Sequence, residues 1–321
     1  MPVAAYAVAS DTGRRRRHNE DDFVVSPPLF AVADGMGGAQ AGEVASGLAA
    51  GALKGGDSNG IDGPARVDAL IQEANRRIYD RASSDPTASG MGTTMTVALV
   101  DGMTVAMGHV GDSRAYLVRG DTMEQLTDDH SLVNELMKSG KLSEKEAQMH
   151  PQRSVITRAV GTDPDVDIDA FAIEAEEGDV FLICSDGLTD MVPDEEILEL
   201  VHRNRDDLEK AVKALVSAAN RGGGEDNITA VAFRMTADAA PSPEDTVAMP
   251  ALGEPDPDEP DERTREYNEA PKTDTMVIPP AADAEPPAAA GAPQARRVRI
   301  VLIALVVLLI AAGLIVWGLV R

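Results

Sequence analysis

Sulfur and imidazole ligands for a metal ion are scarce in this sequence. Its 321 residues contain one cysteine, Cys184, and five histidines, and only 3% of the chain is aromatic. A lone cysteine cannot form an internal disulfide, which suits a reducing compartment, and we expect Cys184 to be a small buried apolar side chain. Any metal site in this protein is therefore expected to use oxygen ligands.

Basic charge is also in short supply. The chain has 29 Lys and Arg residues against 54 Asp and Glu residues, which gives a formal net charge of -25. Nonspecific binding of nucleic acid needs a basic face, so the composition excludes nucleic acid as an expected partner. The run Arg14 to Arg17 is an exception, and for most of its members we expect a solvated loop.

Composition divides the chain into three parts. Residues 1–236 mix apolar segments with glycine turns and are predicted to form one globular domain. Residues 237–299 are rich in Pro, Ala, Asp and Glu, which predicts a disordered acidic linker. Residues 300–320 form an unbroken apolar run that is long enough, at roughly 20 residues, to span a bilayer as a helix.

The apolar run Ile300 to Val320 is predicted to be a transmembrane anchor. The alternative is a buried core helix, but Arg296, Arg297 and Arg299 mark the start of the run. Under the positive-inside bias these arginines stay in the cytoplasm. We therefore expect a single-pass protein of the cell membrane, with the N-terminal domain in the cytoplasm.

Short apolar runs and amphipathic segments alternate in the globular part. Strands are expected at 3–9, 23–25, 29–33, 93–100, 103–110, 114–118, 168–173, 180–184 and 228–234, and helices at 40–54, 64–82, 132–140, 194–202 and 206–220. The strands between 93 and 118 are expected to form an antiparallel meander, and the polar stretch 141–152 a mobile flap. This order predicts an α+β fold in which two antiparallel sheets pack together with helices outside.

Aspartates occur next to several of the expected strands. They are Asp21, Asp34, Asp112, Asp186 and Asp226. A strand that ends in aspartate and then glycine, as at Asp34-Gly35 and Asp186-Gly187, projects a carboxylate from the sheet edge. Oxygen ligands gathered in this way suit a hard cation, which indicates magnesium or manganese.

Six short motifs follow one another along residues 3–235. They are Arg16-x-x-Asn19-Glu20-Asp21, Asp34-Gly35-x-Gly37-Gly38, Gly92-Thr93-Thr94, Gly111-Asp112-Ser113-Arg114, Ser185-Asp186-Gly187 and Glu225-Asp226-Asn227. In this order they resemble the metal-dependent serine/threonine protein phosphatases of the PPM family, also called type 2C. The resemblance implies a four-layer α-β-β-α sandwich with a binuclear Mn or Mg centre in a cleft at one end of the sheets.

The resemblance also implies the metal ligands. Asp34 would bridge the two ions, and the carbonyl of Gly35 would be a further ligand. Three more aspartates would bind one ion or the other, directly or through water: Asp21, Asp186 and Asp226. Together with Asp186, Asp112 occupies the position that holds a third ion in bacterial members.

Other residues are expected to support the same chemistry. Glu20 would act from the outer shell, and Asp190 would hydrogen-bond metal-bound water. Two divalent ions about 3.5 to 4 Å apart acidify a bridging water and clamp the phosphate oxygens. Arg16 would add a bidentate grip on the phosphate. Many eukaryotic members carry histidine at the position of Met36, so protonation of the leaving group must come from elsewhere.

The histidines are expected to have structural or solvent-exposed positions. His109 lies on an expected strand and is assigned to packing. The other four are expected at the surface or in loops: His18, His130, His150 and His202. His130 and His150 flank the expected flap, and a structural role is favoured for the later segment Thr157-Arg158.

Two threonines in the linker lie in similar surroundings. Thr246 in Asp-Thr-Val-Ala-Met-Pro and Thr275 in Asp-Thr-Met-Val-Ile-Pro each follow an acid and precede apolar residues. They are candidates for phosphorylation by a partner kinase or for docking of a phosphothreonine-binding domain. Chance repetition in a biased composition is the alternative.

The sequence thus predicts a membrane-tethered serine/threonine protein phosphatase with two or three Mn or Mg ions. Its expected partners are phosphorylated proteins and a bacterial Ser/Thr kinase whose action it reverses. One alternative is a pseudophosphatase that binds phosphoproteins without turnover. A second is a phosphatase of the same chemistry that acts on small molecules or on an anti-sigma-factor antagonist.

Overall fold

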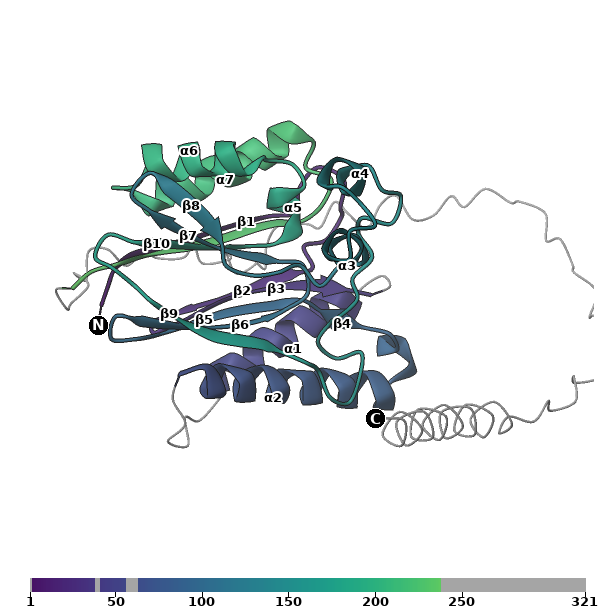
Figure 1. Cartoon of the computed structure of the whole chain (residues 1–321). Coiled ribbons are helices and arrows are strands. Elements are labelled where there is room, and N and C mark those ends of the chain that lie inside the picture. Colours follow the sequence, from purple (N-terminus) through teal and green to yellow (C-terminus); the bar gives the residue numbers. More distant parts are fainter. Residues whose placement is uncertain (1, 38–40, 56–62, 238–321) are drawn as a thin grey trace, which may run out of the picture. The chain divides into compact units, whose positions relative to one another are not determined.

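The computed structural model describes residues 2–37, 41–55 and 63–237. These residues form two antiparallel sheets that pack face to face, with helices on both outer faces (Figure 1). The predicted α+β sandwich is therefore confirmed. The segment 238–321 lies outside the described residues, and with it the expected anchor, Thr246, Thr275 and all but the first residue of the linker.

Each sheet combines strands that are consecutive in the chain with strands from distant segments. In the first sheet the order is β1 (Val3–Asp11), β11 (Ile228–Met235), β10 (Val180–Cys184), β7 (Arg114–Arg119) and β8 (Thr122–Gln125). In the second it is β2 (Asp21–Ser26), β3 (Leu29–Met36), β5 (Met95–Asp101), β6 (Thr104–Val110) and β9 (Asp169–Glu174), with β4 (Gly92–Thr93) paired to β3.

Two long helices cover each sheet. α1 (Ala41–Gly55) and α2 (Gly63–Ser84) pack on the second sheet, and α6 (Asp194–Arg203) and α7 (Leu208–Gly222) pack on the first (Figure 1). The shorter helices are α3 (Leu132–Lys138), α4 (Glu144–Gln148), α5 (Asp186–Thr189) and the 3₁₀ helix η1 (Pro86–Ala88). Among the described helices, none is both long enough and apolar enough to cross a membrane.

Within the part of the chain that the structure describes, aromatic side chains concentrate between the sheets. Phe30 of β3 stacks on Phe233 of β11 with ring centroids 4.3 Å apart, and Phe233 stacks on Phe181 of β10 at 5.0 Å. These three rings are at most 1% exposed. Because large aromatic side chains bury much apolar area, this stack holds the two sheets together at their centre. Cys184 is fully buried, as expected.

The expected meander between residues 93 and 118 is wrong in its last strand. β5 and β6 pair in the second sheet, but β7 pairs with β10 in the first. The chain therefore crosses from one sheet to the other at Gly111–Ser113. Both strands carry runs of buried apolar residues, so their sequences do not show which sheet each one joins.

Glycine is required at the crossing. The φ angle of Gly111 is +114°, and a Cβ atom there would lie 2.6 Å from the side chain of Thr94. A residue with a side chain would be strained in this conformation and would also collide with Thr94. The crossing thus brings Asp112 to the end of the sandwich in a tight turn that requires glycine.

Candidate metal centre

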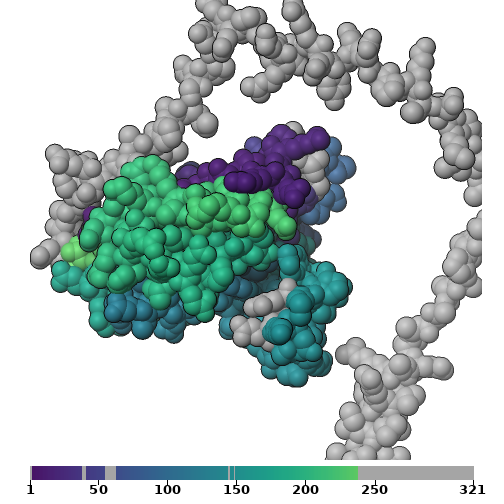
Figure 2. Space-filling view, turned by 90° about the horizontal axis from the view of Figure 1, so that it is seen from above, coloured from purple at the N-terminus to yellow at the C-terminus, as the bar shows by residue number. Residues whose placement is uncertain are grey.

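Five segments of the chain meet at one end of the sandwich. They are the loop 12–20 between β1 and β2, the end of β3, the crossing at 111–113, the start of α5 and the loop before β11. The helices α3 and α4 lie at the same end of the sandwich (Figure 1). In the space-filling view, the purple N-terminal segment and the teal segment of α3 and α4 project on the same side of the molecule (Figure 2).

The predicted aspartates lie together at this end. The charges of the other four members act on Asp34, and we call the set Asp21, Asp34, Asp112, Asp186 and Asp226 the carboxylate cluster. Its members come from both sheets. Asp21 and Asp34 face each other in the ladder of β2 and β3 in the second sheet, whereas Asp186 follows β10 and Asp226 precedes β11 in the first.

Close backbone packing fixes the position of Asp34. A Cβ atom on the next residue, Gly35, would lie 2.2 Å from the carbonyl oxygen of Gly42 and 2.5 Å from that of Glu20, so only glycine fits. The backbone N–H of Asp34 donates to Thr94 Oγ1 at 3.0 Å, and its carbonyl accepts from the backbone N–H of Thr94 at 2.8 Å.

Thr94 also connects Asp34 to the crossing. Because its hydroxyl oxygen accepts the Asp34 N–H, its hydroxyl hydrogen is free to donate to Ser113 Oγ, which lies 2.7 Å away. Ser113 follows Asp112 directly. One buried hydroxyl therefore links the backbones that carry two members of the carboxylate cluster.

A second close approach positions Asp186 and Asp226. A Cβ atom on Gly187 would lie 2.0 Å from the carbonyl oxygen of Asn227, so α5 can begin against β11 only with glycine there. The Asn227 side chain accepts from the backbone N–H of Glu20 at 2.8 Å. It also donates to the carbonyls of Thr12 and His18 at 3.0 and 2.9 Å. Asn227 thereby fastens the loop 12–20 to the cluster.

Two buried carboxylate oxygens of the cluster have no hydrogen-bond partner. Asp21 Oδ2 accepts from Ser185 Oγ at 2.8 Å and from Thr229 Oγ1 at 2.6 Å, but Asp21 Oδ1 has none. Asp186 Oδ1 has none either. Leaving such an atom unpaired costs about 1 to 3 kcal/mol or more for a charged group, so these oxygens indicate a binding role.

The members of the cluster oppose one another's ionisation. Burial raises the pKa of Asp21 to about 6, against the hydrogen bonds from Thr229 and Ser185, and burial together with the charge of Asp129 raises the pKa of Asp112 to about 7. Burial and neighbouring carboxylates also raise the pKa of Asp34 and of Asp186 well above the ordinary range. Like charges in a low dielectric disfavour the ionised forms.

The remaining predicted site residues surround the cluster. Arg16 donates to Asp226 Oδ2 at 2.6 Å and lies 3.8 Å from Glu20 Oε2, which places a positive charge at the edge of the cluster. Its side chain is 48% exposed and can reach a ligand outside the cluster. Asp190, at the end of α5, is 42% exposed, and Arg153 lies 3.9 Å from it. The backbone N–H of Asp190 donates to the carbonyl of Asp186.

The chemistry of these groups fits divalent cations. Within residues 2–37, 41–55 and 63–237, no three Asp, Glu, His or Cys side chains converge tightly enough to form a ready-made ion site. A bound cation would nevertheless give both orphaned oxygens a partner and cancel the repulsion that raises the pKa values. Carboxylates alone, without thiolate or imidazole, match the preference of Mg²⁺ and Mn²⁺.

The sequence did not assign a role to the hydroxyls that hold Asp21. Ser185 was part of a motif, but Thr229 lies inside an apolar strand and Ser10, whose Oγ is 2.8 Å from Thr229 Oγ1, lies in another. A polar residue in an otherwise apolar strand was the available signal. His130 was expected at the surface or in a loop; it does lie in a loop, but it is only 7% exposed.

Comparison with known proteins agrees with this geometry. A model of the protein phosphatase 2C family matches residues 14–229. The serine/threonine phosphatase stp of Listeria innocua is 41% identical over 231 residues, which are 68% of this chain and 91% of that protein. The serine/threonine protein phosphatase PstP of Mycobacterium tuberculosis is 42% identical over 231 residues, 71% of this chain and 44% of that protein.

A solved structure extends the comparison to the metal. The catalytic domain of a serine/threonine protein phosphatase PstP in complex with two manganese ions superposes with a TM-score of 0.68 and 38% sequence identity. The superposition covers 74% of this chain and all of that domain.

Proposed function

The chain belongs to the protein phosphatase 2C family, and from this we propose that it is a metal-dependent serine/threonine protein phosphatase that holds two Mn²⁺ or Mg²⁺ ions in the carboxylate cluster. Its similarity to an enzyme of that activity solved with two manganese ions supports the proposal. The single observation in this chain that carries it is the pair of orphaned oxygens, Asp21 Oδ1 and Asp186 Oδ1, in a cluster of mutually repelling aspartates.

The metal ions and the surrounding residues have separate roles in the proposed hydrolysis. When bound, the metal ions supply a nucleophile at neutral pH and neutralise charge on the transferring phosphoryl group. Asp34, which is buried and acted on by the charges of the other four members, would be a ligand of both ions. Arg16 turns from Asp226 to the phosphate oxygens, and its guanidinium donates two hydrogen bonds. Asp190 orients the attacking water.

The rest of the ligand set is proposed on the same grounds. The Gly35 carbonyl, Asp226 and Asp112 would complete the ligand set, and Asp112 and Asp186 would together hold a third ion. Glu20 acts from outside the set, 3.8 Å from Arg16, and its pKa is raised by burial. Every position at which the family motif requires an acid carries one, which favours an enzyme over a pseudophosphatase that binds phosphoproteins without turnover.

The cellular setting is also a proposal. Phosphorylated proteins are the substrates, and a Ser/Thr kinase makes them. The apolar run Ile300–Val320, preceded by three arginines, anchors the protein in the cell membrane with its catalytic domain in the cytoplasm. Tethering raises the effective concentration of the catalytic domain at membrane-bound substrates. Thr246 and Thr275 are proposed as regulatory phosphorylation sites.

The experiment that tests the proposed function uses the full-length protein. Manganese-dependent release of phosphate from a phosphothreonine peptide is compared for the parent, Asp34→Asn and Asp121→Asn. Asp121 is 90% exposed in the turn between β7 and β8, so its variant is the matched control. Metal-dependent activity in the parent and the control but not in Asp34→Asn is expected.

Three other results would each contradict part of the proposal. A folded, manganese-loaded parent that turns over no phosphopeptide would favour the binding-protein alternative. Turnover of an acyl phosphate or a nucleotide with none of the peptide would favour a small-molecule phosphatase. Thr246→Ala and Thr275→Ala variants that a cognate kinase phosphorylates as well as the parent would remove these two threonines from the proposal.

A further inference from the structure

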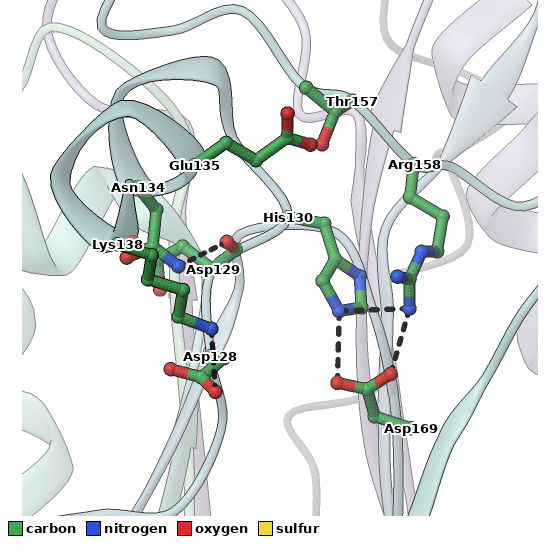
Figure 3. A pocket seen from close by; sticks show the side chains of 9 residues that line it. All are labelled: Asp128, Asp129, His130, Asn134, Glu135, Lys138, Thr157, Arg158 and Asp169. Atoms are coloured by element: carbon green, nitrogen blue, oxygen red, sulfur yellow. Dashed lines mark hydrogen bonds and ion pairs between the residues drawn. The ribbon is translucent and has the colours of Figure 1, made fainter. Parts of the chain in front are cut away.

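A second polar cluster lies beside the crossing at 111–113. It lines a cavity of about 300 Å³ between the loop 128–130, α3, the segment 157–158 and the start of β9 (Figure 3). We call Asp128, Asp129, His130, Lys138, Arg158 and Asp169 the His130 network.

The acids of the His130 network are paired with cations. Lys138 lies 2.8 Å from Asp128, Arg114 donates to Asp129 at 2.7 Å, and Arg158 donates to Asp169 at 2.7 Å. Because each of these acids already forms an ion pair within the protein, the network does not need a bound ligand to balance its charge. Such a set of paired charges can instead hold a neighbouring group in place.

His130 connects this network to the crossing. Its backbone N–H donates to the carbonyl of Gly111 at 2.7 Å, and the backbone N–H of Gly111 donates to His130 Nδ1 at 3.1 Å. On the other side of the ring, Nε2 lies 3.2 Å from Asp169 Oδ2 (Figure 3). His130 thus forms hydrogen bonds with both the backbone N–H and the carbonyl of Gly111, the residue before Asp112.

These contacts determine the tautomer of His130. Nδ1 accepts a hydrogen bond and so carries a lone pair, which places the proton on Nε2, where it is donated to Asp169. Arg158 Nη1 lies 3.1 Å from Nε2 and donates to the other oxygen of Asp169. Arg158 therefore orients Asp169, and Asp169 orients the ring. Burial, which lowers the pKa of His130, agrees with a neutral imidazole.

We propose that His130 is a positioning residue for metal binding: its Nδ1 fixes the Gly111 turn so that the Asp112 carboxylate points at the ion that it shares with Asp186. The inference rests on the proposed function, because Asp112 and Asp186 are its predicted ligands. Partners of this kind around a ligand typically change metal affinity by about 10- to 100-fold. The turn needs such a hold because glycine at φ +114° is otherwise free to change conformation.

A packing role for the same ring is the competing explanation. The His130 ring lies on the ring of His109 with centroids 4.7 Å apart. His109 is itself fixed by Thr96 Oγ1 at 2.9 Å and by the carbonyl of Asp128 at 3.1 Å. If packing on His109 were the function of His130, any loss of the ring would have the same effect.

Two substitutions separate the explanations because both remove the ring. In His130→Asn the amide oxygen can take the place of Nδ1 and accept the Gly111 N–H. In His130→Gln the longer amide reaches Asp169 instead, and the acceptor for Gly111 is lost. Manganese binding to the full-length protein without substrate is measured by isothermal titration calorimetry, with thermal unfolding as a check on folding.

The proposal expects the two variants to differ. His130→Gln should raise the Kd of the most weakly held Mn²⁺ about tenfold, and excess Mn²⁺ should restore its activity, whereas His130→Asn should stay within about threefold of the parent. Equal affinities in the two variants, whether weakened or unchanged, would overturn the proposal.

A second substitution keeps the test open if a ring variant does not fold. Asp169 is 42% exposed, and Asp169→Ala should fold and weaken the same ion about threefold by releasing the ring. Unchanged affinity in folded Asp169→Ala would contradict the proposal. Since binding is measured without substrate, failure here leaves the phosphatase assignment intact, and an inactive parent would leave the binding comparison valid.

Discussion

The carboxylate cluster and the His130 network are neighbouring polar regions built from the same residue type, and they behave in opposite ways. In the cluster, aspartates face aspartates, and burial raises the pKa of Asp21 to about 6 and of Asp112 to about 7. In the network, burial also opposes ionisation of Asp169, but hydrogen bonds from His130 and Arg158 outweigh it and lower the pKa. Carboxylates that are paired with basic side chains stabilise the fold, whereas carboxylates that repel one another are available to bind a metal cation.

The largest expected difference between the two regions appears when one carboxylate charge is removed from each. Asp186→Asn takes away a predicted ligand and should lower kcat/KM on a phosphothreonine peptide about a thousandfold, at the upper end of losses for one electrostatic group in an active site. Asp128→Asn loses only an exposed ion pair with Lys138 and should stay within about twofold. Steady-state kinetics at saturating Mn²⁺ measures both. Similar losses in the two variants would erase the distinction.

The pH dependence of the metal-free protein should reveal the unpaired acids. An unfolded aspartate loses its proton near pH 3.9, but folded Asp21 keeps it to about pH 6. The folded state therefore binds more protons in between, so its stability falls as pH rises from about 4 through 6 to 7. Asp21 alone accounts for roughly 3 kcal/mol at 1.36 kcal/mol per pKa unit.

Urea unfolding in EDTA at pH 5 and pH 7.5 measures about half of this loss, because only the last pH unit below the folded pKa of about 6 lies inside that range. Saturating Mn²⁺ should remove or reverse it, because metal and protons compete for the same oxygens. Buried His109, whose pKa burial lowers to about 4, contributes in the opposite direction over this pH range, so the Asp21→Asn variant is measured beside the parent. An equal pH dependence in the parent and in Asp21→Asn would show that Asp21 is not under repulsion.

Neutralising a single acid should change stability with opposite sign in paired and unpaired surroundings. At pH 8 in EDTA, Asp112→Asn relieves repulsion and should stabilise the fold by about 2 kcal/mol. Asp179, 1% exposed, accepts from Arg119 at 2.6 Å and from the N–H of Glu176 at 2.7 Å, so Asp179→Asn should destabilise by about 2 kcal/mol. Denaturant midpoints give both values, and shifts in the same direction would refute the contrast.

The smallest effect is expected at the exposed edge of the His130 network. Lys138 and Asp128 are 55% and 64% exposed, so their ion pair is well solvated. Lys138→Gln should change the free energy of unfolding by less than about 1 kcal/mol. It should leave the Mn²⁺ affinity unchanged, since Lys138 does not touch His130, Arg158 or Asp169. A tenfold change in that affinity would show that the whole network, and not the His130 ring, controls the ion.

The sequence predicted the main strands and the cluster because their signals are local. An apolar run followed by Asp-Gly identifies both a strand and its terminal carboxylate. The order of the six motifs along the chain indicated the protein family. The sequence did not predict β8, α4 and α5, which have four or five residues each and are too short for a period to be recognised.

The errors concern contacts between distant segments. Nothing near Arg114 shows that β7 leaves the sheet of β6 to pair with β10. In the same way, the burial of His130 depends on Gly111, Asp169 and His109, which come from other parts of the chain. Tertiary pairing of this kind leaves no periodic signal in a single sequence.

The origin of the cluster in both sheets has a dynamic consequence. Asp21 and Asp34 belong to one sheet and Asp186 and Asp226 to the other, so an ion held between them ties the two layers together at their open end. Transient separation of the layers would then release such an ion. The rate of metal exchange should match the slowest amide hydrogen exchange at the facing ends of β2, β3, β10 and β11.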